Sequence, residues 1–111
     1  MFIVDCLIGN TDRHNGNFGF IKNIKTEELT LAPIYDCGSC LFSTFTDEKM
    51  EEVLNNEGLL RDCIKNTSSA IKYNGSKIKY YDFITKLEND DCSEALMRMY
   101  PRIDINKIND I

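Results

Sequence analysis

A polar loop lies directly between an apolar segment and two short apolar runs, and this order constrains how the first third of the chain can fold. Met1–Ile8 is apolar except for Asp5 and is compatible with a helix. Gly9 would end that helix, because glycine readily adopts the left-handed conformation found just past a helix C-terminus. The polar stretch from Asn10 to Asn17 that follows is predicted to be a loop.

Two apolar and aromatic runs come next, Phe18–Ile24 and Leu29–Ile34, with the polar residues Lys25–Glu28 between them. Short runs of this kind around a polar turn predict a β-hairpin. Pro33 would end the second strand or confine it to an edge, because proline has no backbone N–H to donate.

The remainder of the chain has a mainly helical pattern. We expect helices over 47–54 with Thr46 or Asp47 as the cap, and over 59–65, 80–87, 92–99 and 105–111. Asn74-Gly75-Ser76 predicts a turn. The expected fold class is α+β and mainly helical, with one short β-hairpin beside a helical bundle, in a single partial domain of residues 1–111.

Composition and charge exclude some classes of function. The net charge is −5 and the sequence pI is about 4.8, which argues against nonspecific nucleic-acid binding because that needs a basic face. No apolar stretch is long enough to span a bilayer, so we expect no membrane partner. The five cysteines are odd in number and scattered, which indicates reduced thiols in a cytoplasmic protein.

Three side chains point to phosphoryl transfer. Asp12 and Asn17 lie in the polar loop at the Asp-to-Asn spacing of a protein-kinase catalytic loop, and Asp36 follows the predicted hairpin. This reaction needs a carboxylate to orient the acceptor hydroxyl and oxygen ligands to hold a cation against the phosphates. Magnesium prefers hard oxygen ligands and takes few of them from protein, so one Asn and one Asp form a plausible pair.

The sequence of this region resembles that of the HipA family of bacterial serine/threonine kinases. Residues 8–19 read IGNTDRHNGNFG, and residues 32–39 read APIYDCGS. The HipA catalytic loop is similar, and a Tyr-Asp pair takes the place of the Asp-Phe-Gly sequence of eukaryotic-type kinases. Phosphatidylinositol kinases share the Asp-Arg-His run, but Tyr35-Asp36 favours the HipA-like alternative. The resemblance covers residues 1–42, and residues 43–111 match only in their helical pattern.

The resemblance implies the C-terminal lobe of a kinase that transfers the γ-phosphoryl group of ATP to a hydroxyl of a protein substrate. Asp12 would be the catalytic aspartate, and Asn17 and Asp36 would hold Mg²⁺ and thereby the ATP phosphates. His14 matches the family's loop histidine and is grouped with the catalytic residues as one that braces the loop. A lipid substrate is a variant of this hypothesis.

The elements that grip the nucleotide are missing from the sequence. No Gly-rich loop, strand lysine or helix glutamate precedes the catalytic loop, where the family has them. We therefore expect a longer natural protein, or an N-lobe provided in cis or in trans, with weak or absent ATP binding and no activity in the isolated chain. The alternative is a noncatalytic module that binds an N-lobe or an antitoxin-like partner, as in toxin–antitoxin pairs.

Two features remain open. Cys37 and Cys40 form a C-x-x-C motif, which would suit a thiol-redox protein or half of a zinc site. The favoured interpretation is that both are small buried residues after the metal-binding aspartate. Arg13 is expected to form an ion pair at the rim of the site, with a phosphate contact as the alternative.

Overall fold

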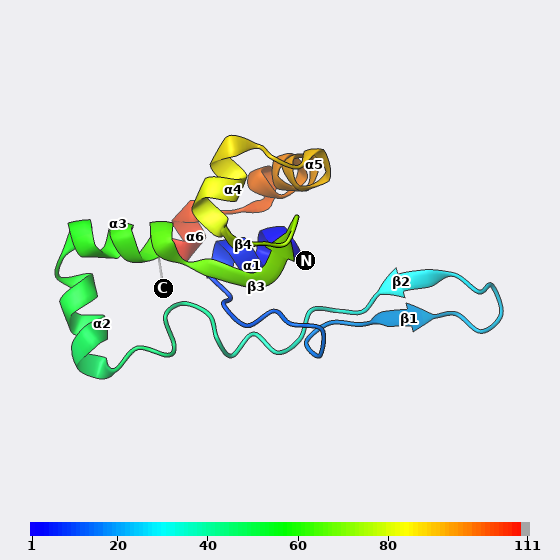
Figure 1. The fold of residues 1–111 in the computed structure, drawn as a ribbon, viewed down its shortest axis with the longest axis horizontal. Coiled ribbons are helices and arrows are strands. Elements are labelled where there is room, and N and C mark those ends of the chain that lie inside the picture. The colour runs from blue at the N-terminus through cyan, green and yellow to red at the C-terminus, as the bar shows by residue number, and fades with distance from the viewer. Residues whose placement is uncertain (110–111) are drawn as a thin grey trace.

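The computed structural model describes residues 1–109. Over these residues the chain forms α-helices and two antiparallel hairpins (Figure 1). The elements are α1 (Phe2–Ile8), β1 (Phe20–Lys22), β2 (Leu29–Leu31), α2 (Asp47–Leu54), α3 (Glu57–Asn66), β3 (Ser68–Tyr73), β4 (Ser76–Lys79), α4 (Tyr80–Lys86), α5 (Asp90–Met99), the 3₁₀ helix η1 (Tyr100–Arg102) and α6 (Ile105–Asn109). The predicted mixed and mainly helical fold class is confirmed.

The first hairpin forms where the sequence predicts it. β1 and β2 pair antiparallel with Ile21 opposite Thr30, and every residue of both strands is exposed. Figure 1 shows this hairpin as an arm that extends away from the helices. β2 ends at Leu31, before Pro33, as expected from the missing N–H of proline.

The second hairpin was not predicted, although its turn was. Asn74 and Gly75 both have positive φ, 49° and 78°, as the tight turns of two-residue hairpins require. Only the first buried position of β3 is polar, at Ser69. Ile71 and Tyr73 before the turn and Ile78 after it alternate with polar residues, so the sequence carried a signal for both strands that the prediction did not use.

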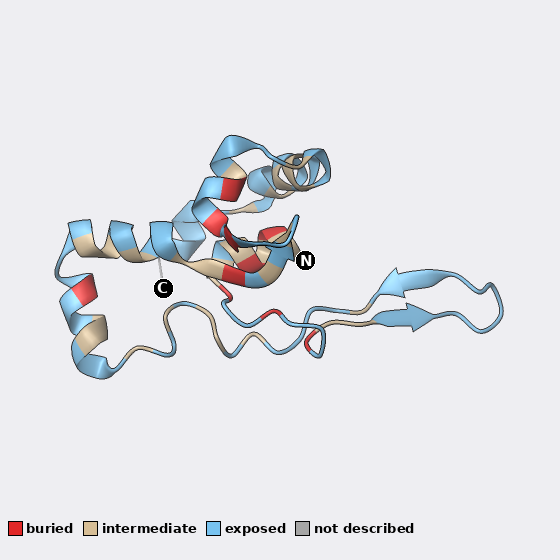
Figure 2. Cartoon of the chain, viewed as in Figure 1, coloured by how far each residue is buried: buried red, intermediate tan, exposed pale blue. Residues whose placement is uncertain are grey.

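A small core lies where α1 meets β4 and α4. Its buried apolar side chains are Ile3, Ile78, Tyr80 and Phe83, and Val53 is buried separately in α2. The ring of Phe2 packs against Tyr80 and Phe83 with centroid separations of 5.3 Å in both cases. Figure 2 shows buried positions on α1, β3, β4 and the start of α4, with further ones on α2 and in the loop after α1. The loop after α1 therefore starts from the best-packed part of the molecule.

The predicted helices are all present, with small differences at their ends. Thr46 caps α2, since its side chain accepts from the backbone N–H of Lys49. α5 begins earlier than expected because Asn89 caps it. Ile111, predicted on the apolar face of the last helix, lies outside the described residues.

Among residues 1–109, no helix has the length and apolar character needed to cross a membrane.

Candidate catalytic and cation-binding site

The polar loop is anchored through Asn10, which has no exposed surface. Gly9 ends α1 in the left-handed region at φ 63°, as predicted. The side-chain amide of Asn10 donates to Asp5 Oδ1 at 3.0 Å, and its oxygen accepts from the backbone N–H of Asp12 at 3.1 Å. The hydroxyl of Tyr80 donates to the carbonyl of Asn10 at 2.5 Å. These bonds join the start of the loop to α1 and α4.

Asn17 binds the backbone carbonyl of Asp12, whereas Asn10 binds its backbone N–H. The side chain of Asn17 is almost fully buried, and its Nδ2 donates to the carbonyl of Asp12 at 2.8 Å. The backbone of Asp12 is therefore bonded at both its N–H and its C=O, while 58% of its side chain is exposed. Because the amide nitrogen of Asn17 is engaged, Oδ1 is the atom of this side chain that remains for a cation.

His14 has a defined tautomer in this arrangement. Its Nδ1 accepts from the backbone N–H of Gly16 at 3.0 Å, so a neutral imidazole carries its proton on Nε2. Nε2 lies 3.8 Å from Oδ2 of Asp12, which is longer than a hydrogen bond. The contact with Gly16 ties the imidazole to the backbone of the loop.

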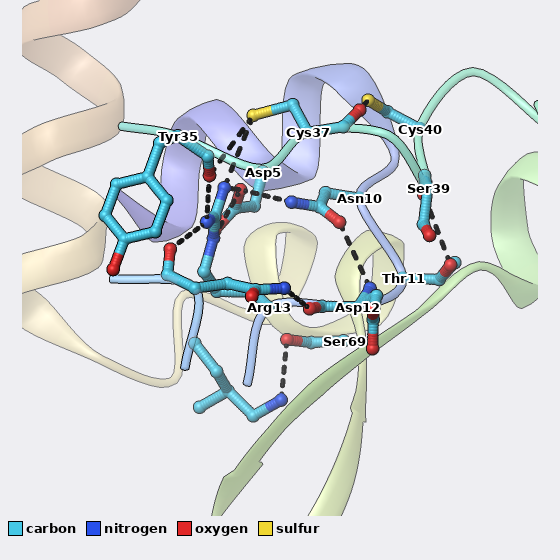
Figure 3. A network of polar contacts seen from close by, with 12 residues as sticks. Asp5, Asn10, Thr11, Asp12, Arg13, Tyr35, Cys37, Ser39, Cys40 and Ser69 are labelled. Carbon is cyan, nitrogen blue, oxygen red and sulfur yellow. Dashed lines mark hydrogen bonds and ion pairs between the residues drawn. The ribbon is translucent and has the colours of Figure 1, made fainter. Parts of the chain in front are cut away.

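Arg13 is buried, so the prediction of a rim ion pair is wrong. Arg13 and Asp5 both have no exposed side-chain surface. Nη2 of Arg13 lies 2.9 Å from Asp5 Oδ1, and Nε lies 3.0 Å from Asp5 Oδ2 (Figure 3). The hydrogen bond with Asp5 holds the pKa of Arg13 above its already high ordinary value, and burial opposes this only in part. The result is a buried, bidentate pair.

The same guanidinium contacts both halves of the predicted cation site. Nη1 donates to the backbone carbonyl of Asn17 and, at 2.6 Å, to that of Tyr35. Nη2 donates to the Cys37 thiol sulfur at 3.4 Å. Asp36 lies between these two contacts and adopts a left-handed backbone with φ 54°, which Asp tolerates better than most residues. The loop of Asn17 and the segment of Asp36 thus meet at Arg13.

The C-x-x-C motif forms part of this packing. Cys37 and Cys40 are free and half-buried rather than buried as predicted. The Cys40 thiol donates to the carbonyl of Cys37, and burial raises the pKa of Cys40. A raised pKa keeps a thiol protonated and unreactive at neutral pH. Within residues 1–109, no three His, Cys, Asp or Glu side chains cluster as metal ligands. The redox and zinc hypotheses gain no support.

The donor set suits a hard cation. Asn17 offers an amide oxygen and Asp36 an exposed carboxylate. Mg²⁺ typically takes one or two protein ligands and completes its shell with water and substrate phosphates. One amide oxygen and one exposed carboxylate therefore fit Mg²⁺ bound together with a nucleotide.

Sequence reasoning missed the residues beneath the site. Asp5 was seen only as an interruption of an apolar helix, and Tyr80 only as the first residue of the predicted helix 80–87. A lone carboxylate in an apolar helix is a usable signal, because a buried charge needs a partner. The sequence does not say that Arg13 is that partner, since the loop geometry decides it.

Comparisons with known proteins agree with a kinase-like arrangement. No family model matches the chain. The chain is 49% identical, over all of its length, to the serine/threonine-protein kinase CtkA of Helicobacter pylori, and it spans 35% of that protein's length. It also matches the crystal structure of a Helicobacter pylori proinflammatory kinase CtkA with a TM-score of 0.83, covering 97% of this chain and 38% of that one. The chain is therefore homologous to part of a serine/threonine kinase.

Proposed function

We propose that this chain forms the catalytic part of the C-terminal lobe of a HipA-like kinase that transfers the γ-phosphoryl group of ATP to a Ser or Thr hydroxyl of a protein. One observation carries the proposal. The backbone of Asp12, whose carboxylate is exposed, is held by two buried asparagines, and the neighbouring Arg13 binds the segment that presents Asp36. Homology to part of a serine/threonine kinase supports the same conclusion.

Asp12 orients the acceptor hydroxyl and accepts its proton. Its backbone is fixed by Asn10 and Asn17, so the carboxylate starts from a set position while its oxygens face solvent. Positioning of this kind accounts for much of the catalysis of phosphoryl transfer. His14 braces the loop through Gly16 and keeps its Nε2 on the side of Asp12.

Asn17 and Asp36 hold Mg²⁺, which when bound neutralises charge on the ATP phosphates. The chain's own contribution is to keep two oxygen ligands on segments that meet at one buried guanidinium. The groups that grip the nucleotide come from an N-lobe, in the same polypeptide or in a separate one. The isolated chain should therefore bind ATP weakly and turn over slowly or not at all.

A noncatalytic role in partner binding is the second candidate. An apolar groove of about 460 Å³ lies between the end of α1, α3 and α4, and its lining includes Leu7, Leu41, Ile64 and Tyr81. All four side chains are more than 40% exposed. An exposed apolar surface of this kind is typical of a docking site, here for an N-lobe or an antitoxin-like protein.

A chimera tests the kinase proposal. These 111 residues would replace the matching 35% of the Helicobacter pylori relative, and incorporation of the γ-phosphoryl group of ATP into protein would be measured. We expect activity that Asp12→Asn lowers by about 10²- to 10⁴-fold. Asp62→Asn, an exposed aspartate on α3, is the matched control and should change nothing.

Two results would overturn the proposal. One is a folded chimera that binds ATP but transfers no phosphoryl group. The other is equal activity in the Asp12→Asn and Asp62→Asn variants. In either case partner binding through the apolar groove would become the better account of the chain.

A further inference from the structure

We propose that the buried Asp5–Arg13 pair is a positioning device that sets the spacing between Asn17 and Asp36. The affinity for the cation would then depend on two residues that do not touch it. The inference rests on the proposed function, because it concerns the same cation site. It goes beyond that function by assigning roles to residues outside the catalytic motif.

The first step is that one atom joins the two ligand segments. Nη1 of Arg13 donates to the carbonyls of Asn17 and Tyr35 at once. Asn17 is itself a proposed ligand, and Tyr35 immediately precedes the other one, Asp36. The arm of β1 and β2 separates these segments in the chain and is fully exposed. Their spacing is therefore held at the base of the arm, where Arg13 lies.

The second step is that Asp5 fixes the guanidinium. Its carboxylate accepts from Nε and Nη2 of Arg13, so the plane of the guanidinium is defined from α1. The same carboxylate accepts from Asn10, whose oxygen binds the backbone N–H of Asp12. One buried carboxylate thus aligns the catalytic aspartate and both cation-binding segments (Figure 3).

The third step is that only arginine can fill this position. Arg13 sends donors toward the Asp5 carboxylate, toward two carbonyls and toward the Cys37 sulfur. A lysine would keep the charge but offers a single nitrogen at the end of a flexible stem. Water cannot easily replace the missing donors, because the side chain has no exposed surface. Arg13→Lys should therefore preserve the charge balance and loosen the alignment.

The test is a Mn²⁺ titration of the 111-residue chain, followed by paramagnetic broadening of its amide NMR signals. In the native chain the broadening should centre on Asn17 and Asp36. Arg13→Lys should weaken the apparent Kd by about 10- to 100-fold, the usual cost of losing a group that orients a metal ligand. Val53→Ala is the control for general destabilisation, because Val53 is fully buried in α2 and outside this network. Its Kd should match that of the native chain.

Asp5→Asn is the second variant, since it removes the charge but keeps an oxygen that can accept from Arg13 and Asn10. It should weaken Mn²⁺ binding in the same direction. A folded Arg13→Lys chain with a native Kd overturns the proposal, as does a Val53→Ala chain that loses affinity equally.

A native chain that shows no broadening at millimolar Mn²⁺ would count against the cation site itself. Hydrogen exchange then decides the role of Arg13 separately. The amides of Thr11 and Asn17, which bond to Ser39 and His14, should exchange faster in Arg13→Lys than in Val53→Ala. Equal exchange rates would overturn the positioning role.

Discussion

Arg13 and Asp5 form a bidentate ion pair in which neither side chain has any exposed surface. Asp5→Ala would leave the guanidinium buried without its charge partner, and losing one member of such a pair typically costs about 3–5 kcal/mol. We expect a loss of this size in the free energy of unfolding, measured by urea denaturation. Glu57→Ala is the matched control.

Glu57 pairs with Arg61 at 2.6 Å on the surface of α3, where both side chains are mostly exposed. Exposed pairs contribute about 0–1 kcal/mol, so the control should change stability little. Similar losses in Asp5→Ala and Glu57→Ala would show that burial of the first pair has no energetic consequence.

Tyr80 ties α4 to the catalytic loop, because its hydroxyl donates to the buried carbonyl of Asn10. Tyr80→Phe should lower the free energy of unfolding by about 1–3 kcal/mol, the range for leaving a buried polar group unsatisfied. Tyr81→Phe, at a neighbouring position with a 44% exposed side chain, should change it by less than about 0.5 kcal/mol. Thermal unfolding of both variants provides the measurement, and a larger effect at Tyr81 would contradict the assignment.

Asp36 should decide whether the chain responds to a cation and nucleotide together. Amide signals near Asn17 and Asp36 are expected to shift when Mg²⁺ and ATP are added, and these shifts should vanish in Asp36→Asn. Asparagine also tolerates the left-handed backbone found at φ 54°, so this variant should remain folded. Persistence of the shifts in Asp36→Asn, with Asp62→Asn as the control, would exclude Asp36 as a ligand.

The chain should lose stability at alkaline pH through the half-buried Cys6 thiol and the buried Tyr80 hydroxyl. Burial raises the pKa of the Cys6 thiol from 9.0 to about 11 and that of the Tyr80 hydroxyl from 10.0 to about 12. The folded chain therefore holds these protons more tightly than the unfolded chain. The stabilisation of the folded chain by these two protonated groups is complete below pH 9. It is lost as the pH rises through about 11, where Cys6 loses its proton, and then through about 12, where Tyr80 does.

Cys6→Ala should reduce the fall in the free energy of unfolding between pH 9.0 and about pH 11. Urea unfolding at intervals between pH 8 and pH 11 measures it, because the free energy of unfolding falls in that window only if the folded chain binds more protons. An unchanged slope in Cys6→Ala would mean that Cys6 is not the group responsible.

Local patterns in the sequence predicted the helices and the first hairpin. The cap residue Thr46, the terminating Gly9 and the polar turn at Lys25–Glu28 each act over only a few neighbouring residues, and each is found where expected. The second hairpin was predicted only as a turn, although Ile71, Tyr73 and Ile78 alternate with polar residues around it. The pattern is short and begins with the buried polar residue Ser69, so it spans few residues on either side of the turn.

The sequence by itself determined which groups are available for chemistry, since the order and spacing of Asp12, Asn17 and Asp36 can be read directly from it. The tertiary structure decided how those groups are held. Arg13 looked like a surface residue, yet it is buried against Asp5 because the loop turns back under α1. A charge can be buried only where the fold brings a partner within hydrogen-bonding distance, and that proximity is a property of three-dimensional packing rather than of sequence spacing.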